Sequence, residues 1–256
     1  MLALKLTLTP ILIAAATLAA RRWGPVVGGT LTGLPLTSGP VSVFLLLEQG
    51  REFTAIAARG SVIGLVGVAA FCVSYAHAAG RFGPVGCLAI GFAAYLPATA
   101  LMRWLDPGLF LGALLVAAAL GAALVAIPIH ALPEREPPPP PWDIPARMVA
   151  ATGMVLAITA AAATLGATWT GLLSPFPVFS SVLAAFAHLQ SGPHAATRLQ
   201  RGLVAGVFSF AAFFIVVSLL VEQKGAVATY AIASGVAIAV NAVGLVLLSR
   251  RERMMS

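Results

Sequence analysis

The sequence predicts an all-α, polytopic membrane protein of about nine transmembrane helices, built as two four-helix repeats around one connecting helix. Three observations lead to this prediction: an apolar composition, a succession of long uncharged segments, and an internal repeat without gaps. Of the 256 residues, 60% are hydrophobic and 9% are charged, and the mean hydropathy is +0.99. These values lie outside the range of soluble globular domains and inside that of membrane proteins.

The charged and reactive residues exclude several classes of function. The net charge is +7, but the basic residues stand at the ends of apolar segments and form no stripe with aromatics, so nucleic-acid binding is not expected. Cys72 and Cys87 lie within apolar segments and are expected to be buried free thiols. The histidines lack metal-ligand spacing, and the sequence has no nucleophile and base pair, phosphate loop or cofactor motif. We therefore expect no metal, no cofactor and no enzymatic activity.

Nine segments nearly free of charge follow one another along the chain. Most are close to the ~20 residues that a helix needs to cross ~30 Å of hydrocarbon. The first is expected to be a retained anchor and not a cleaved signal peptide, because Arg21 and Arg22 follow it while only Lys5 precedes it. The segments cover roughly 3–20, 25–47, 55–79, 82–102, 107–131, 148–167, 168–189, 203–221 and 226–248.

A proline-rich stretch divides the chain after the fifth segment. Residues 131–147 read ALPEREPPPPPWDIPAR, and consecutive prolines favour an extended, semi-rigid spacer. The expected organisation is a first membrane repeat over 1–104, a connecting transmembrane helix over 105–131, a linker over 132–146, and a second membrane repeat with a basic tail over 147–256.

The two halves align with each other without any gap at a constant offset of 142 positions. Apolar matches are common by chance in such a composition, but matched prolines, arginines and glycines in one alignment are not, which favours an internal duplication. The informative matches are Gly29 with Gly171, Pro35 with Pro177, Ser38 with Ser180, Gly50 with Gly192, Arg59 with Arg201, Gly60 with Gly202 and Gly64 with Gly206.

The odd number of segments predicts that the repeats are inverted. If every segment spans, the single fifth helix makes the second repeat enter the membrane from the opposite face. With the C-terminus and the linker in the cytoplasm, ten basic residues face inward and five outward, as the positive-inside rule requires. The inward set is Arg21, Arg22, Arg81, Arg135, Arg147, Arg198, Arg201, Arg250, Arg251 and Arg253, and the outward set is Lys5, Arg51, Arg59, Arg103 and Lys224.

Prolines interrupt the second and seventh segments, at Pro35 in GLPLTSGP and at Pro177 in LSPFPVFSS. A proline breaks the hydrogen-bond ladder of a helix, which is costly away from water. The two segments either span as broken helices or return as re-entrant hairpins, which would make the repeats parallel. The charge count is the same for both topologies, so it does not decide between them. The length of the segments favours spanning, broken helices.

The stretch GLLSPFPVF from Gly171, followed by an apolar run with Ala and His and then by Gly192, resembles the GlpM family of small bacterial inner-membrane proteins. These proteins look like about one copy of the repeat, so the resemblance covers chiefly 147–248 and more weakly 3–104. It implies a multi-pass protein of the cell inner membrane. The doubled plan is also similar to the small multidrug and drug/metabolite transporters, which implies export or exchange of a small solute. The acid that the small multidrug transporters carry in their first helix has no counterpart here, so proton coupling by that route is not expected.

The hydroxyls at the two breaks are the candidate substrate-binding groups. Thr37, Ser38, Ser180 and Ser181 lie where freed backbone groups can line a cavity near the bilayer midplane. The structural alternative is that these residues only repair the proline break or support helix packing.

Two equivalent motifs of the form Arg-Gly-x-x-x-Gly follow the breaks, and their glycines are expected to allow close helix packing. In the first copy, Glu48 is expected to neutralise Arg59. The second copy has Gln190 in place of Glu48, so Arg201 is expected to lack a partner and to be available for an anionic ligand. The alternative for both arginines is that they snorkel to the membrane interface, since both lie near the end of a segment. His188, close to Gln190, is a candidate for a protonatable gate. Asn241, deep in the ninth segment, is expected to form an interhelical hydrogen bond.

The function predicted from these features is a transporter or channel-like permease in the lipid bilayer for a small solute, with its site between the two broken helices. The alternative is a membrane scaffold or an envelope-assembly protein. Scaffolds tend to carry soluble segments for their partners, and this sequence has only a short linker, which favours transport. A homodimer is left open.

Overall fold

The computed structural model describes residues 2–36, 38–129, 140–165 and 176–253, and within them the side chains of 7–36, 38–129, 140–157 and 176–247. All regular elements in these ranges are α-helices, which confirms the all-α class, whereas the nine transmembrane helices in two four-helix repeats stay a prediction. In chain order they are α1 (Leu2–Trp23), α2 (Pro25–Thr32), α3 (Ser38–Ile63), α4 (Leu65–Ala78), α5 (Pro84–Leu105), α6 (Leu109–Ala126), α7 (Asp143–Leu165), α9 (Val178–Ser191), α10 (Pro193–Leu220) and α11 (Ala226–Arg253).

Local sequence explains many of the helix ends. Pro25, Pro84 and Pro193 occupy the first positions of α2, α5 and α10. Proline suits that position because its fixed φ is already helical and the missing N–H would have had no partner in the helix. Asp106 ends α5 in the left-handed conformation, with φ 39°.

Five helical stretches of the described residues are long and apolar enough to cross a bilayer, which supports a multi-pass membrane protein. These stretches are Ser38–Ala78, Pro84–Leu105, Leu109–Ala126, Pro193–Leu220 and Ala226–Leu247.

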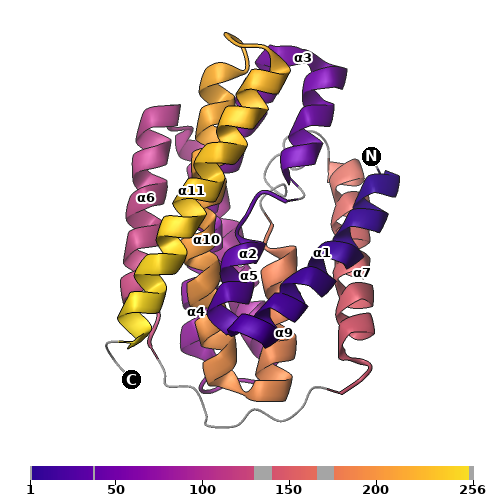
Figure 1. Cartoon of the computed structure of the whole chain (residues 1–256), viewed down its shortest axis with the longest axis vertical. Coiled ribbons are helices and arrows are strands. Elements are labelled where there is room, and N and C mark those ends of the chain that lie inside the picture. The colour runs from indigo at the N-terminus through magenta and orange to yellow at the C-terminus, as the bar shows by residue number, and fades with distance from the viewer. Residues whose placement is uncertain (1, 37, 130–139, 166–175, 254–256) are drawn as a thin grey trace.

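Helix α10 lies at the centre of the bundle and packs against α2, α3, α4, α6, α9 and α11 (Figure 1). Helix α6 contacts both α4 and α10, and α1 packs against α7. The antiparallel pair of α4 and α5 in the first half has its counterpart in α10 and α11 in the second. The core is therefore shared between the halves and is not divided into two separate cores.

The closest helix crossing joins α2 of the first half to α10 of the second. A Cβ atom added to Gly29 would lie 2.2 Å from the carbonyl oxygen of Leu199, and one added to Gly202 would lie 2.2 Å from that of Val26. Gly33 and Gly206 meet in the same way one turn further on. The prediction that the motif glycines allow close packing is confirmed for Gly202 and Gly206, whose partners are Gly29 in α2 and Gly33 at its C-terminal cap. It is wrong for Gly60 of the first motif, where an added Cβ would have no atom within 4 Å.

The second segment is interrupted without reversing its direction. Figure 1 shows α2 and the first part of α3 both rising in the view, joined by the non-helical residues around Pro35. This part of the chain is therefore a broken helix and not a hairpin. The corresponding interruption in the second half is described only from Phe176 onward, because residues 166–175 lie outside the described ranges.

Corresponding helices of the two halves run in opposite directions. In Figure 1, α1 descends while α7 rises, and the first part of α3 rises while α9 descends. The chain then descends from α3 into α4, whereas α10 rises to the top of the view, where α11 begins its descent towards the C-terminus.

Equivalent residues of the two halves also share local backbone geometry. Gly50 has φ 83° and ψ −179°, and Gly192 has φ 86° and ψ −179°. Each sharply bends the chain, between the two parts of α3 and between α9 and α10, and the positive φ is a conformation that glycine adopts without a steric penalty. The link after α4 and the link after α10 carry the same N–H···O bonds, since Phe82 donates to Ala78 and Lys224 donates to Leu220.

Candidate functional site

The two proline breaks have the same hydrogen-bond pattern. The N–H of Leu36 donates to the carbonyl of Leu34 at 2.8 Å, and the N–H of Val178, 142 positions later, donates to that of Phe176 at 2.8 Å. Pro177 has φ −79° and ψ 58°, which is an inverse γ-turn. Each proline carbonyl then accepts the N–H four residues ahead, at 2.8 Å from Gly39 to Pro35 and at 2.9 Å from Ser181 to Pro177. The interruption is thus a defined local structure, present twice.

The serines of the second break support its backbone. Ser180 and Ser181 are buried, and their hydroxyls donate to the carbonyl oxygen of Pro177 at 3.1 and 2.6 Å. In the first break, Ser38 is half-buried at the start of α3, and Thr37 lies outside the described residues. The structural role that the sequence left as an alternative is therefore present for Ser180 and Ser181. Whether any of these hydroxyls also binds a solute stays a prediction.

Aromatic side chains hold the second break in place. The ring of Phe176 stacks on that of Phe92 with centroids 4.9 Å apart and meets that of Tyr95 edge-on at 5.3 Å. Phe92 and Tyr95 belong to α5, so the first half of the chain fixes the break of the second half. Such aromatic pairs add about 0.5–1.5 kcal/mol to the energy of burial.

The two breaks differ in exposure. Pro177 and Val178 are buried, whereas Pro35 is half-buried and Leu36 is 43% exposed. The same difference continues along the following helices, because Phe44 is 37% exposed and its counterpart Phe186 is half-buried. Equivalent sequences are therefore packed differently in the two halves.

The expected ion pair between Glu48 and Arg59 is wrong. Arg59 pairs instead with Asp106, with Nη2 and Oδ1 2.8 Å apart, and both side chains are partly exposed. Glu48 is exposed near the end of the first part of α3. The bend at Gly50 separates Glu48 from Arg59, whereas Asp106 lies in the link between α5 and α6, next to α3 in the folded chain.

The expectation that Arg201 lacks a partner is also wrong. Its Nη1 donates to the carbonyl oxygens of Leu124 at 2.6 Å and of Ile127 at 3.0 Å, and the residue is buried. These carbonyls belong to the last turn of α6, where the helix dipole favours a positive charge. The equivalent arginines thus contact opposite ends of α6. Arg59 pairs with Asp106 in the link that precedes α6, and Arg201 binds carbonyls at the C-terminal end of α6.

His188 lies in α9 and faces α4. Its Nδ1 is 3.4 Å from the hydroxyl of Tyr75, and the two rings meet edge-on with centroids 6.2 Å apart. Its role as a gate stays a prediction.

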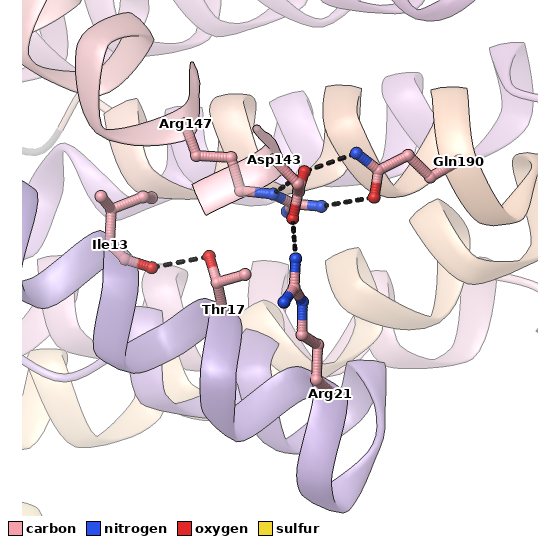
Figure 2. A network of polar contacts seen from close by, with 6 residues as sticks. All are labelled: Ile13, Thr17, Arg21, Asp143, Arg147 and Gln190. Atoms are coloured by element: carbon pink, nitrogen blue, oxygen red, sulfur yellow. Dashed lines mark hydrogen bonds and ion pairs between the residues drawn. The ribbon is translucent and has the colours of Figure 1, made fainter. Parts of the chain in front are cut away.

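A buried polar network joins α1, α7 and α9, and we call it the Asp143 cluster. It consists of Arg21, Asp143, Arg147 and Gln190 (Figure 2). The carboxylate of Asp143 is fully buried and accepts hydrogen bonds from all three partners, from Arg147 at 2.7 Å. Arg147 also donates to Oε1 of Gln190 at 3.3 Å, and its guanidinium lies 5.0 Å from the ring centroid of Phe186.

The partners of Asp143 keep it charged. Burial by itself raises the pKa of this carboxyl, but the hydrogen bonds from Arg147 and Gln190, the charge of Arg147 and the hydrogen bond from Arg21 outweigh it and hold the pKa below its ordinary 3.8. Because the pKa is lower in the folded state than in the unfolded state, the cluster stabilises the fold above that ordinary value. The contribution is lost as the pH falls through the folded-state pKa.

Gln200 is a second polar group that the sequence did not single out. It is fully buried in α10, and neither its Oε1 nor its Nε2 has a hydrogen-bond partner in the part of the chain that the structure describes. Asn241 in α11, by contrast, donates to the carbonyl oxygen of Thr30 at 3.2 Å and so forms the predicted interhelical bond. A buried amide without partners is costly, and in native proteins such a group commonly faces water, an ion or a ligand.

Comparison with known protein families, curated proteins and solved structures returned no match. The resemblance to the GlpM family rests on the sequence alone. Within the described residues, no three His, Cys, Asp or Glu side chains lie close enough together to hold a metal ion.

Proposed function

We propose that the protein is a multi-pass membrane transporter or channel-like permease for a small solute, built as a four plus one plus four inverted repeat around α6. The observation that carries the proposal is the turn found at both Pro35 and Pro177, followed by equivalent helices, the first part of α3 and α9, that run in opposite directions. Transporters built from inverted repeats place discontinuous helices of this kind around a central site.

The contacts of α6 support the inverted arrangement. This helix packs against α4 and α10, which are equivalent in the two halves, and Arg59 and Arg201 approach its two ends. A single odd helix near an axis between two inverted halves would have such contacts. In this topology the linker and the C-terminus face the cytoplasm, in agreement with the excess of basic residues on that side.

The proposed solute site lies between the breaks, with Ser38, Ser180 and Ser181 as candidate ligands and Gln200 added. The amide of Gln200 offers two donors and one acceptor that the described residues leave unused. A small polar solute would satisfy them during passage. Arg201 is withdrawn from the candidate ligands, because its guanidinium is occupied by the end of α6.

The test begins with thermal unfolding of the purified protein against a panel of inorganic anions, cations and small polar metabolites. A ligand present at 100 times its Kd stabilises a protein by about 2.7 kcal/mol. The compound that stabilises most is then used in a flux assay with the protein in liposomes. Stabilisation by a compound without flux above that of empty liposomes would contradict transport.

The amides Gln200 and Asn241 provide a matched pair for the same assay. Gln200→Leu removes an unpartnered buried group, so the variant should be at least as stable as the parent and yet lose flux. Asn241→Leu removes a partnered amide, so it should lower stability, by roughly 0.5–2 kcal/mol, and keep most of the flux. Flux unchanged in Gln200→Leu would remove this residue from the site.

A further inference from the structure

The Asp143 cluster closes one end of the bundle. It joins α1, α7 and α9 where α7 begins, at the end of the molecule where α9 turns into α10 and where α11 ends (Figure 1). Figure 2 shows Arg21 reaching from α1 to the carboxylate, while Gln190 approaches it from α9. Arg147 lies against the ring of Phe186 in α9, so this end is held by charge and by an aromatic contact.

The described residues at the equivalent positions in the first half do not form this closure. The counterpart of Gln190 is Glu48, which is exposed and has no ion pair with any side chain that the structure describes. Phe44, the counterpart of Phe186, is 37% exposed. The counterpart of Asp143 is Met1, which brings no carboxylate. Among the described side chains, the contacts that close one end therefore have no equivalent at the other.

The cluster can release α1 without breaking apart as a whole. The bonds between Asp143 and Arg147 lie within α7, four residues apart, and persist if α1 moves away. Among the ion pairs of the described side chains, that of Arg21 with Asp143 joins α1 to α7, which also pack against each other. The side chain of Arg21 is 33% exposed, so water can solvate it on release. The buried carboxylate of Asp143 keeps its bonds from Arg147 and Gln190 when Arg21 leaves, so the separation costs less than it would for a buried charge that loses its only partner.

We propose that the Asp143 cluster is the gate of the solute pathway at the linker end, closed in the structure described here, and that it opens by separation of Arg21 from Asp143. The inference rests on the proposed function, because two inverted halves in different packing states are what alternating access requires.

Cysteine labelling tests the gate without any solute. Thr17 is 1% exposed and lies one turn before Arg21 on α1, where its hydroxyl donates to the carbonyl of Ile13 at 2.7 Å (Figure 2). With Cys72 and Cys87 replaced by Ala, Thr17→Cys gives a single thiol behind the gate. The probe is a charged, membrane-impermeant thiol reagent, applied in lipid nanodiscs, where both faces are accessible.

Arg21→Gln should raise the labelling rate of the Thr17→Cys thiol about tenfold, because it shifts the gate towards the open state. Asp143→Asn should do the same. The matched control is Arg22→Gln, which removes the same charge from the neighbouring, exposed position and should leave the rate within about twofold. If Asp143→Asn does not fold, Arg21→Gln decides alone, since it leaves Asp143 paired with Arg147.

Equal labelling rates of the Thr17→Cys thiol in the Arg21→Gln and Arg22→Gln variants would overturn the proposal of a gate. The result is separable from that of the flux assay, since labelling needs no substrate. If Arg21→Gln raises the labelling rate but the protein shows no measurable solute flux, the gate is supported and transport is contradicted. If the protein shows solute flux but Arg21→Gln leaves the labelling rate unchanged, transport is supported and the gate is contradicted.

Discussion

Single residues in this protein show where short-range reasoning on the sequence succeeds and where it fails. The roles of Pro35 and Pro177 follow from backbone properties of proline, which do not depend on distant partners. The ionic contacts do depend on them: Arg21 lies 122 positions from Asp143, and Arg201 lies 77 from Leu124. A sequence search for nearby charges therefore chose Glu48 for Arg59 and found no partner for Arg201.

One signal for the Asp143 cluster was present in the sequence. Asp143 and Arg147 are spaced four residues apart, directly before the apolar run that begins at Met148, which is the spacing of an ion pair on one helix face. The third and fourth members, Arg21 and Gln190, come from helices whose neighbours only the folded chain defines.

The equivalent arginines should differ strongly in their importance for stability. Arg201→Gln leaves the last carbonyls of α6 without their buried donor, so the free energy of unfolding should fall by roughly 2–4 kcal/mol. Arg59→Gln removes a partly exposed ion pair, worth about 0–1 kcal/mol. Chemical or thermal unfolding in detergent measures both, and an equal loss in the two variants would contradict the assigned contacts.

At the scale of helices, the positions of the breaks were predictable, but several boundaries were not. Helix α10 begins at Pro193, ten positions before the apolar segment expected from 203. Its first turns contain His194, Thr197, Arg198 and Gln200, which lower the local hydropathy. Hydropathy depends only on composition, so it placed the start of this segment too late. Thr197 and Gln200 are nevertheless buried, because α10 lies at the centre of the bundle.

The glycine motifs should respond unequally to the same substitution. In Gly202→Ala the new Cβ would lie 2.2 Å from the carbonyl oxygen of Val26, which is backbone and cannot move aside easily, so the fold should lose roughly 1–3 kcal/mol. Gly60, the equivalent glycine, has no atom within 4 Å of an added Cβ. Gly60→Ala should change stability by less than about 1 kcal/mol, towards greater stability because alanine favours helix.

Thermal unfolding of the two alanine variants distinguishes them directly. A loss in Gly60→Ala as large as that in Gly202→Ala would mean that α3 is packed as tightly as α10. No loss in Gly202→Ala would mean that α2 and α10 are further apart than described.

At the scale of the whole molecule, the sequence predicted an all-helical membrane protein and an alignment of its halves, but not how the halves combine. The short helix α2 of the first half packs on α10 of the second, and Phe92 and Tyr95 hold the break near Pro177. Such contacts between halves depend on tertiary packing, which the repeat pattern alone does not specify. The opposite directions of equivalent helices bear most directly on function.

The most direct test of the inverted repeat is the membrane side of two equivalent positions. Glu52 and His194 are 142 positions apart and both are exposed, each two residues after a bending glycine. They are better sites than Gly50 and Gly192, whose positive φ strains a cysteine. In a background without Cys72 and Cys87, we expect an impermeant thiol reagent to label Glu52→Cys from outside intact cells and His194→Cys only in inside-out vesicles. Labelling of both from the same side would contradict the inverted arrangement.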